Sequence, residues 1–361
     1  MASVEWGKYR IDDLFKIQTS AKRFDANKVN IIENGRYPYV VRTSSNNGQK
    51  GFLDENESFL NAENTISFGQ DTATIFYQEK PYFTGDKIKV LVPKVYKFNK
   101  KNAQFFLASM NIAFSKFSWG SSRFNVDVLK EQVIMLPTKC DSIDFEFMES
   151  FIEELEAERI KELEAHLTVT GLKDYILTEE EHSVLDSYED WEWNTFNLED
   201  LFGKSTRGKR LKSADRIPGE LPFVTAGEAD EGISDFIGND VAIFSENTTT
   251  IDMFGSAKYR NYKYGGDDHV AVVHTETLPK LASIFVTSAI HKSSHSGQFD
   301  YSKNFYAKDA DALNIQLPSR GGQPDYECMA TFISAVQKIV IKDVVLFADR
   351  KIGMAKEIVN K

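Results

Sequence analysis

Short runs of β-branched and aromatic residues, separated by Gly, Asn and Asp, occur in two parts of the chain. Runs of this length between turn residues are typical of β-strands. The pattern therefore predicts a twisted β-sheet in each part. The runs are Tyr37–Val41, Thr65–Phe68, Thr74–Tyr77 and Ile88–Val92, followed by Val241–Phe244 and His269–His274.

Apolar residues return every three or four positions in four other segments, and this spacing predicts helices. Two of them are short, Asn102–Phe114 and Lys280–Ile290, and two are long and follow Asp144 and Asp325. The apolar stripe of the first long helix is Phe145, Met148, Ile152, Leu155, Ile160, Leu163 and Leu167, and that of the second is Tyr326, Met329, Ile333, Val336, Val340, Val344 and Phe347.

A long helix with one apolar stripe needs a partner that buries the stripe. The spacing is that of a coiled coil, so we expect the two long helices to pack antiparallel against each other as a spacer. The alternative is that each helix packs only on its own domain. The residues expected in the helix–helix packing are Met148, Ile152, Leu155, Met329, Ile333, Val336 and Val340.

The second half of the chain repeats the first. Trp6 and Trp193 each begin a WxxxxxxDLF block, 187 residues apart, and Gly85-Asp86 corresponds to Gly266-Asp267 at an offset of 181 that then holds steady. Matched order and spacing over this length indicate a duplication. We predict a mixed α/β (α+β) chain with tandem domains at 1–140 and 191–322, spacer helices at 141–167 and 323–358, and a polar connector with little periodicity at 168–190.

Composition agrees with two globular domains, since the 361 residues are 42% hydrophobic and 27% charged. The net charge is −11, but residues 141–192 hold 18 acidic and three basic residues, so this segment carries −15 and the rest carries +4. The acidity therefore does not exclude nucleic acid as a partner of the two domains. No apolar run is long enough to span a membrane, the N-terminus lacks a secretory signal, and there are only two cysteines. We expect a cytoplasmic protein with no membrane partner.

The common signatures of an enzyme or a metal site, GxGxxG, HExxH and CxxC, do not occur in the sequence. Gly203-Lys204-Ser205 lacks the upstream glycine of a phosphate loop, which favours a basic turn. His291 and His295 lie four residues apart and are interpreted as polar surface or DNA contact. Asp267-Asp268-His269 is interpreted as the same turn as Gly85-Asp86-Lys87. We predict no catalytic residue, no metal ion and no cofactor in this chain.

Several loops combine cations with amide, hydroxyl and aromatic side chains, the groups that contact DNA phosphates and base edges. They are 115–123 in the first half and 201–216, 258–264 and 291–304 in the second. A charged run can also be a solvated face, and aromatic alternation a strand. Because such loops recur in both halves, we favour DNA binding. The candidates are Lys22, Arg23, Arg42, Asn46, Lys116, Trp119, Ser121 and Arg123, then Arg207, Lys209, Arg210, Lys258, Tyr259, Arg260, Tyr262, His291, Lys292, His295, Gln298 and Lys303.

Together these features resemble the specificity subunits of type I restriction-modification systems. The resemblance rests on the WxxxxxxDLF blocks, on Thr65–Gly69 and Tyr82–Asp86, on the Leu-Pro before each long helix and on the duplication. The connector segment Thr170–Tyr175 is more similar to compact, type IIB-like subunits, and the long helices are shorter than in many type I members. The resemblance implies two target-recognition domains similar to that of adenine-N6 DNA methyltransferases, with an antiparallel helical spacer that docks modification subunits. It also implies that S-adenosylmethionine belongs to the partner.

We therefore expect a non-catalytic DNA-specificity subunit that reads a bipartite, asymmetric target in double-stranded DNA. The expected partners are two modification subunits and a restriction subunit. A spacer helix of roughly 27 residues is about 40 Å long, so the half-site centres should lie about 12 base pairs apart. The alternatives are a decoy that sequesters modification subunits without binding DNA, and a nuclease or methyltransferase with an unrecognised active site.

Overall fold

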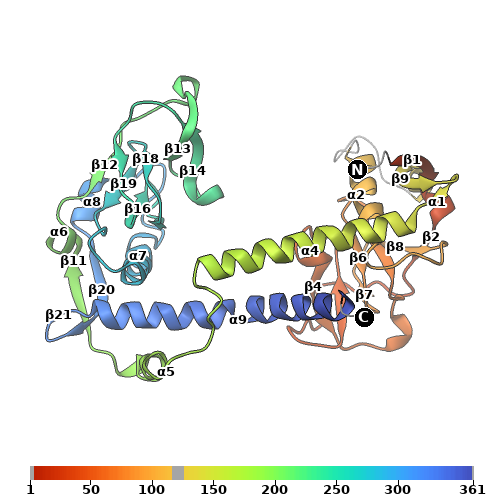
Figure 1. Cartoon of the computed structure of the whole chain (residues 1–361), viewed down its shortest axis with the longest axis horizontal. Helices are drawn as coiled ribbons and strands as arrows, with labels where there is room; N and C mark the ends of the chain where they lie inside the picture. The colour runs from red at the N-terminus through yellow and green to blue at the C-terminus, as the bar shows by residue number, and fades with distance from the viewer. Residues whose placement is uncertain (1–3, 116–125, 360–361) are drawn as a thin grey trace. The chain divides into compact units, whose positions relative to one another are not determined.

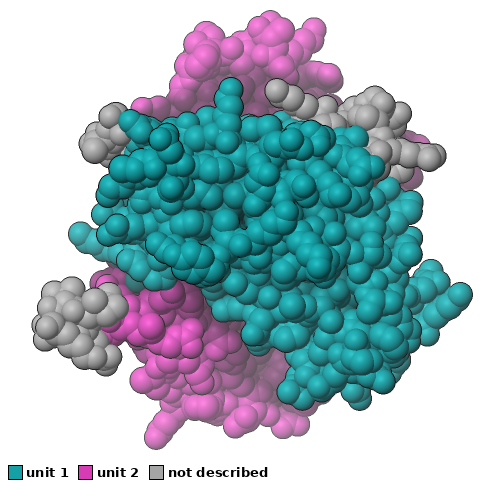
Figure 2. Space-filling view, turned by 90° about the vertical axis from the view of Figure 1, so that its right-hand side faces the viewer, with its two compact units in different colours: residues 1–162 teal, residues 163–361 magenta. Residues whose placement is uncertain are grey.

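The computed structural model describes residues 4–115 and 126–359 of the chain (Figure 1). It divides into two compact units, Met1–Glu162 and Leu163–Lys361, coloured teal and magenta in Figure 2. The long helix α4 (Phe145–Val169) begins in unit 1, and its last residues belong to unit 2.

Within its described residues, unit 1 folds into three small sheets. The strands are β1 (Glu5–Arg10), β2 (Phe15–Thr19), β3 (Tyr37–Val40), β4 (Gln49–Leu53), β5 (Thr65–Gly69), β6 (Ile75–Gln78), β7 (Phe83–Thr84), β8 (Ile88–Pro93), β9 (Val133–Lys139) and β10 (Ser142–Ile143). The strand orders are β1-β9-β10, β2-β8-β5-β6 and β4-β3-β7. Neighbouring strands are antiparallel except for β3 and β7, which are parallel.

The described residues of unit 2 repeat this topology with one additional strand. Its strands are β11 (Trp193–Asn197), β12 (Thr206–Arg207), β13 (Pro218–Val224), β14 (Ile233–Ile237), β15 (Ile243–Phe244), β16 (Thr248–Asp252), β17 (Ala257–Arg260), β18 (Tyr264–Gly266), β19 (Val270–Val273), β20 (Asn314–Arg320) and β21 (Gln323–Pro324). The orders are β11-β20-β21, β12-β19-β16-β17 and β14-β13-β18-β15. The parallel pair recurs as β13 and β18.

Helices close the core of each unit. The helical segments are α1 (Ile11–Leu14), η1 (Asn46–Gly48), η2 (Glu57–Phe59), α2 (Ala103–Phe114), α3 (Val126–Glu131) and α4, then α5 (Glu179–Asp186), η3 (Tyr188–Asp190), α6 (Leu198–Phe202), η4 (Ser213–Asp215), η5 (Ala229–Gly232), α7 (Lys280–Ser294), α8 (Ala307–Asp311) and α9 (Tyr326–Val359). In α2, Phe106, Met110 and Phe114 return at helical spacing and are buried. Ala282, Val286 and Ile290 do the same in α7.

The predicted strands and short helices agree with these bounds, with small differences. The four runs predicted in unit 1 are strands β3, β5, β6 and β8, and the helix predicted at Asn102–Phe114 is α2. In unit 2, Val241–Phe244 contributes only the two residues of β15. The helix predicted at Lys280–Ile290 continues to Ser294 as α7.

The duplication extends to buried hydrogen bonds. The Tyr82 hydroxyl lies 3.1 Å from Thr65 Oγ1 in unit 1, and the Tyr264 hydroxyl lies 2.9 Å from Thr248 Oγ1 in unit 2. All four side chains are buried, and burial raises the pKa of both tyrosines well above the usual range. The hydroxyls therefore stay neutral, and each pair satisfies polar groups that would be costly to bury alone.

Backbone hydrogen bonds correct the predicted alignment of the two copies by one residue. The Gly85 N–H donates to Val40 O in unit 1, and the Asp267 N–H donates to Val224 O in unit 2. The structural counterpart of Gly85 is thus Asp267, at an offset of 182, and not Gly266. It follows that Asp86 corresponds to Asp268. The sequence alignment chose an offset of 181 because that offset pairs two identical Gly-Asp dipeptides, Gly85-Asp86 and Gly266-Asp267.

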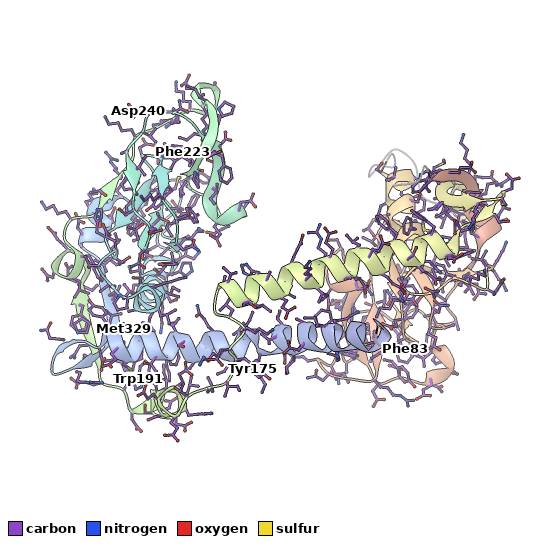
Figure 3. The ribbon with its side chains drawn as sticks, in the orientation of Figure 1. Phe83, Tyr175, Trp191, Phe223, Asp240 and Met329 are labelled. Atoms are coloured by element: carbon purple, nitrogen blue, oxygen red, sulfur yellow. The ribbon has the colours of Figure 1, made fainter. Side chains whose placement is uncertain are left out.

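Both long helices start in the same way and anchor in their own domain. The side chains of Asp144 and Asp325 accept hydrogen bonds from the N–H groups of the third residue that follows them, an N-cap arrangement. One turn further on, Met148 and Met329 are completely buried in the domain cores (Figure 3 labels Met329). These two methionines therefore do not line a helix–helix seam, and the alternative interpretation holds for this part of each helix.

Further along α9, the buried stripe lies one residue away from the predicted one. Ile341, Val345 and Ala348 pack with Leu163 and Leu167 of α4 and with the start of the connector. Of the residues predicted for the seam, Val340 is 72% exposed and Leu155 38% exposed, Ile152 and Val336 are partly exposed, and Ile333 contacts the domain core. The prediction counted large apolar residues, whereas the observed stripe includes Ala348, whose small side chain permits close approach.

The connector, predicted to lack periodic structure, contains helix α5. A capping box starts this helix: the Glu181 N–H donates to Thr178 Oγ1, and the Thr178 N–H donates to Glu181 Oε2 at 2.8 Å. Glu181 is only 5% exposed and accepts hydrogen bonds from Ser334 (2.6 Å) and Lys338 (3.0 Å) of α9. The Lys338 ammonium also pairs with Asp174 at 3.2 Å. These contacts clamp α5 to α9.

Among the helices that the structure describes, we find none with the length and apolar character needed to cross a membrane.

Candidate nucleic-acid interface

Unit 1 contains a groove of about 1080 Å³ next to the parallel strand pair. Its walls are the loop after β2, the loop after β3 and the start of β4. Polar and cationic side chains predominate in the lining, including Arg23, Asn27, Arg42, Gln49 and Lys50. Tyr39 lies buried at the base of the groove, where its hydroxyl donates to Phe24 O at 2.6 Å. Burial raises the pKa of Tyr39 to about 12, so this contact persists at neutral pH.

Carboxylates hold the cations of this groove in place. Arg23 Nη1 lies 3.2 Å from Asp86, and Arg42 Nη1 lies 2.5 Å from Asp71 Oδ2. The same Asp71 oxygen accepts from the Lys87 ammonium at 2.7 Å. Three cations therefore pair with these two carboxylates, while a third carboxylate, that of Asp25 in the lining, pairs with Lys28 at 3.8 Å.

The other predicted contacts of unit 1 border this groove or lie outside the described residues. The Lys22 ammonium is over the rings of Phe24 and Phe59, at 4.5 and 4.7 Å from their centroids. Asn46 is exposed, and its amide donates to Gln49 O across the turn of η1. Lys116, Trp119, Ser121 and Arg123 fall in the part of the chain that the structure does not describe.

The groove also includes residues that the sequence analysis did not single out, namely Asn27, Gln49 and Lys50. Gln49 and Lys50 reach it because Asn46 and Asn47 adopt positive φ angles of 47° and 54° and turn the chain sharply into β4. An Asn-Asn-Gly sequence is a signal for such a turn, but the sequence alone does not say which loop the turn faces.

In unit 2 the loop after β12 carries exposed cations. Arg207, Lys209 and Arg210 are all exposed, and no ion pair involves them within the described residues. Between them, Gly208 crosses the β18 backbone so closely that a Cβ atom would lie 1.6 Å from Gly266 O. The close crossing fixes where these cations emerge from the domain.

Strand β17 corrects part of the prediction for 258–264. Arg260 is 1% exposed, with Nε donating to Thr250 Oγ1 and Nη1 to the Tyr262 hydroxyl, both at 2.9 Å. Lys258 pairs with Glu228 at 3.2 Å, and the Tyr259 hydroxyl donates to Asn247 Oδ1 at 3.0 Å. Arg260 is therefore not available to DNA, and Lys258 and Tyr259 are engaged within the domain. The alternation of cations and aromatics here is that of a strand with one buried face.

The end of α7 and the loop after it form a separate polar surface. His291 and His295 stack with ring centroids 4.8 Å apart. His291 Nδ1 accepts from the Ala257 N–H, and His295 Nδ1 lies 3.1 Å from Phe254 O. The backbone of the β16–β17 turn thus fixes both rings. The remaining candidates of this surface, Lys292, Gln298 and Lys303, are exposed.

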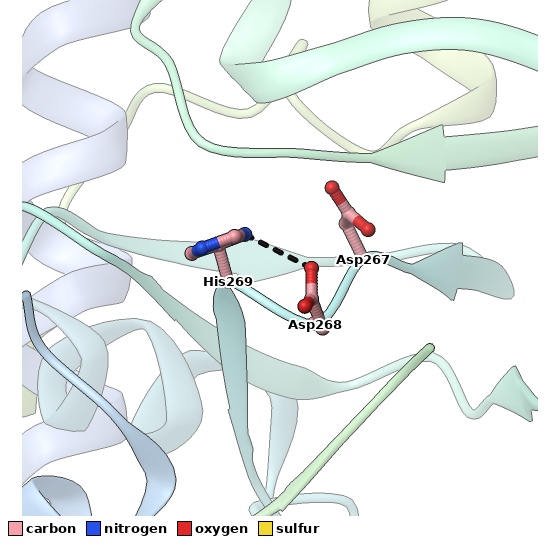
Figure 4. A group of neighbouring side chains, drawn as sticks. All are labelled: Asp267, Asp268 and His269. Carbon is pink, nitrogen blue, oxygen red and sulfur yellow. Dashed lines mark ion pairs between the residues drawn. The ribbon is translucent and has the colours of Figure 1, made fainter. Parts of the chain in front are cut away.

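One cluster of metal-ligand residue types occurs among the residues that the structure describes: Asp267, Asp268 and His269, whose ligand atoms all lie within 4.8 Å of one another (Figure 4). Asp268 Oδ1 lies 2.9 Å from His269 Nδ1, and the Leu211 N–H donates to Asp267. Burial raises the pKa of Asp267, and the neighbouring Asp268 carboxylate adds to the shift. That the chain binds no metal ion stays a prediction, and this turn is the place to test it.

Comparison with known proteins also divides the chain into two similar parts. The type I restriction modification DNA specificity domain matches residues 3–165 and again 189–343. The specificity subunit S.BcgI of a type II restriction enzyme from Heyndrickxia coagulans is 27% identical over 344 residues, which is 94% of this chain and 96% of that subunit.

One solved structure agrees on the fold. The S subunit of a type I restriction-modification system from M. genitalium aligns over 99% of this chain and 95% of its own, with 17% identity and a TM-score of 0.61. The HsdS subunit from Thermoanaerobacter tengcongensis aligns over 96% of this chain and 91% of its own at 13% identity, but its TM-score of 0.30 is too low to add to the argument. With the family domain present twice over most of its length, the chain belongs to the restriction-modification DNA specificity family, whose members are DNA-recognition subunits rather than catalytic ones.

Proposed function

We propose that this chain reads a bipartite, asymmetric DNA target and recruits adenine methyltransferase subunits, and with them a restriction subunit, to that target. The observation that carries the proposal is one topology built twice with different loop residues. The sheet orders coincide except for the additional strand β15, and the buried Tyr–Thr pairs coincide as well, whereas η1 carries Asn46-Asn47 and its counterpart η5 carries Asp230-Glu231. Two similar scaffolds with different surfaces are suited to reading two different half-sites.

In this proposal the long helices set the gap between the half-sites. Helix α4 has 25 residues. At 1.5 Å per residue that is about 38 Å, or about 11 base pairs of duplex DNA. The two modification subunits would dock on this spacer and bind S-adenosylmethionine, and each would extrude an adenine for methylation. This chain would supply only position and orientation, in the cytoplasm with the DNA.

The similarity to the specificity subunit of a type II restriction enzyme over nearly the full length of both chains supports the compact, type IIB-like form of such a system.

The test is methylome sequencing of cells that express the chain with the methyltransferase subunits of its own system. We expect adenine methylation in a two-part motif whose halves differ and are separated by a fixed gap. A single continuous motif would contradict the bipartite proposal. Copurification with a methyltransferase, without salt-dependent DNA binding or methylation, would show that the chain is a decoy.

A further inference from the structure

Arg42 is the most firmly positioned cation of the groove in unit 1. Its guanidinium is held at 2.5 Å by Asp71, and its side chain is 33% exposed, compared with 54% for Arg23. The stem of Arg42 lies against Gly69, where an added Cβ atom would come within 3.3 Å of Arg42 Cγ. Asp71 is in turn paired with Lys87, so its carboxylate is fixed from two sides. The arginine therefore presents its remaining N–H groups to the groove from one orientation.

The second copy identifies the position equivalent to Arg42. The Val41 N–H donates to Gly48 O at 2.8 Å, and the Thr225 N–H donates to Gly232 O at 2.9 Å. The residue that follows is Arg42 in unit 1 and Ala226 in unit 2. By strand pairing, Gly69 corresponds to Asp252, because they face Ile88 and Val270 respectively. The arginine and the glycine that makes room for it are thus both absent from unit 2.

The loop after β2 in unit 1 and its counterpart after β12 in unit 2 differ from the Arg42 position, because both contain cations. The first loop carries Lys22 and Arg23, and the second carries Lys209 and Arg210. Cations occur here in both copies. Phosphates are the same at every base pair, whereas base edges are not. A phosphate contact is therefore expected in both copies, and a base contact only in the copy that reads that base.

We propose that Arg42, positioned by Asp71, recognises a guanine in the first half-site, and that Arg23 contacts a phosphate. A fixed guanidinium can donate two parallel hydrogen bonds to O6 and N7 of guanine in the major groove, the pairing that distinguishes guanine best. Gln49 and Asn27, whose amides can also contact base edges, line the same groove. This inference rests on the proposed function of the chain as a reader of half-sites.

The experiment uses the full chain assembled with its methyltransferase subunits and a set of DNA duplexes that carry the target with each base pair changed in turn. R42Q and R42K should lose about 10- to 100-fold of the discrimination at one G·C pair of the first half-site, with the second half-site read as before. R42K keeps a charge beside Asp71, so it separates loss of the two-pronged contact from loss of folding. R23Q should weaken binding equally to all sequences and lower the salt dependence by about one released ion.

The matched control is R36Q, because Arg36 is also an arginine of unit 1 paired with a carboxylate, Glu57, at 3.2 Å, but lies outside the groove lining. It should leave the discrimination unchanged. If R42Q and R42K keep the discrimination of the parent at every position, or weaken all sequences equally, the assignment of Arg42 is wrong while the bipartite motif of the parent still stands. If the parent complex itself has no bipartite motif, both proposals fall.

Discussion

The buried carboxylate of Glu181 holds the connector helix α5 against α9. Burial by itself would raise the pKa of this carboxyl. The hydrogen bonds from Ser334, from the Thr178 backbone and from Lys338 outweigh burial and lower the pKa below the ordinary value of 4.5. A group with a lowered pKa in the folded state stabilises the fold when it is charged.

We expect E181Q to lower the free energy of unfolding at pH 7 by about 2 kcal/mol, because a charge-assisted hydrogen bond to Lys338 is lost. The contribution of Glu181 is fully present above about pH 4.5 and is lost as the pH falls through the lowered pKa of the folded state. Denaturant unfolding of the two proteins should therefore differ at pH 7 and converge toward pH 3. E180Q, at the exposed neighbouring position, is the control and should match the parent at every pH. A constant E181Q difference over this range would exclude the titration of Glu181 as its cause.

Substitution of Gly208 by alanine is a second test at the scale of single residues. Alanine there would force a Cβ atom against Gly266 O, a backbone atom that cannot move away alone. G208A should destabilise the chain by about 1–3 kcal/mol, as overpacking does. G353A is the opposite case: Gly353 lies in α9 with no atom within 4 Å of an added Cβ, so alanine should stabilise the chain by up to about 1 kcal/mol. Thermal unfolding of both variants should show shifts of opposite sign. A G208A variant as stable as the parent, or more stable, would contradict the crossing described at Gly208.

At the scale of elements, the buried face of α9 changes along its length. Its first turns pack in the domain core through Met329, and its middle is clamped to α5 through Lys338. Its later turns bury Val345 and Ala348 against the end of α4. An exposed apolar stripe remains beside them, with Ile339, Val340, Val344, Leu346, Phe347 and Met354 between 38% and 72% exposed.

Two valines five residues apart test this register. Val345 is 1% exposed and Val340 is 72% exposed. V345A should cost about 1–3 kcal/mol of unfolding free energy because it leaves a cavity, and V340A should change it by less than about 0.5 kcal/mol. The readout is the midpoint of denaturant unfolding. An equal loss of unfolding free energy in the two variants, or a larger loss in V340A, would support the helix–helix seam that the sequence predicts.

Much of this element structure can be predicted from the sequence, and the failures have physical causes. The duplicated WxxxxxxDLF blocks and the periodic segments lead to the correct strands and helices. The pattern cannot distinguish Met148 in a domain core from Met148 in a helix pair, since both bury it. It also overlooks Ala348, because a small residue can be buried as effectively as a large one. The capping-box pair Thr178 and Glu181 is a sequence signal for the connector helix, but a search for apolar periodicity does not detect it.

The candidate site is less predictable than the fold. Arg260 looks like a surface cation in the sequence and is buried in the structure, because strand alternation places every second residue inside. Gln49 and Asn27 are unremarkable in the sequence and meet only through the folding of separate loops.

For the molecule as a whole, charge is segregated along the chain. Residues 141–192 carry −15, whereas the loop after β12 carries the exposed cations Arg207, Lys209 and Arg210. DNA binding should therefore depend on a few cations in spite of the negative net charge.

We expect K209Q and R210Q each to reduce the slope of log binding constant against log salt concentration by about one, without changing the motif that is read. Fluorescence anisotropy of the assembled complex on one duplex, at a series of salt concentrations, measures this slope. K342Q, an exposed cation of α9, serves as the control and should leave the slope unchanged. A change of motif in K209Q or R210Q would instead make the loop after β12 a reader of bases.

The buried pairs Tyr82–Thr65 and Tyr264–Thr248 have an evolutionary consequence. The Tyr82–Thr65 pair does not line the groove of unit 1, so mutations of exposed groove residues leave this buried contact intact. Ancestors with two identical halves could thus have drifted apart in what they recognise while their interiors stayed under selection. A new target sequence could arise by changes in one loop of one half of the gene, while the other half still recognises its own half-site.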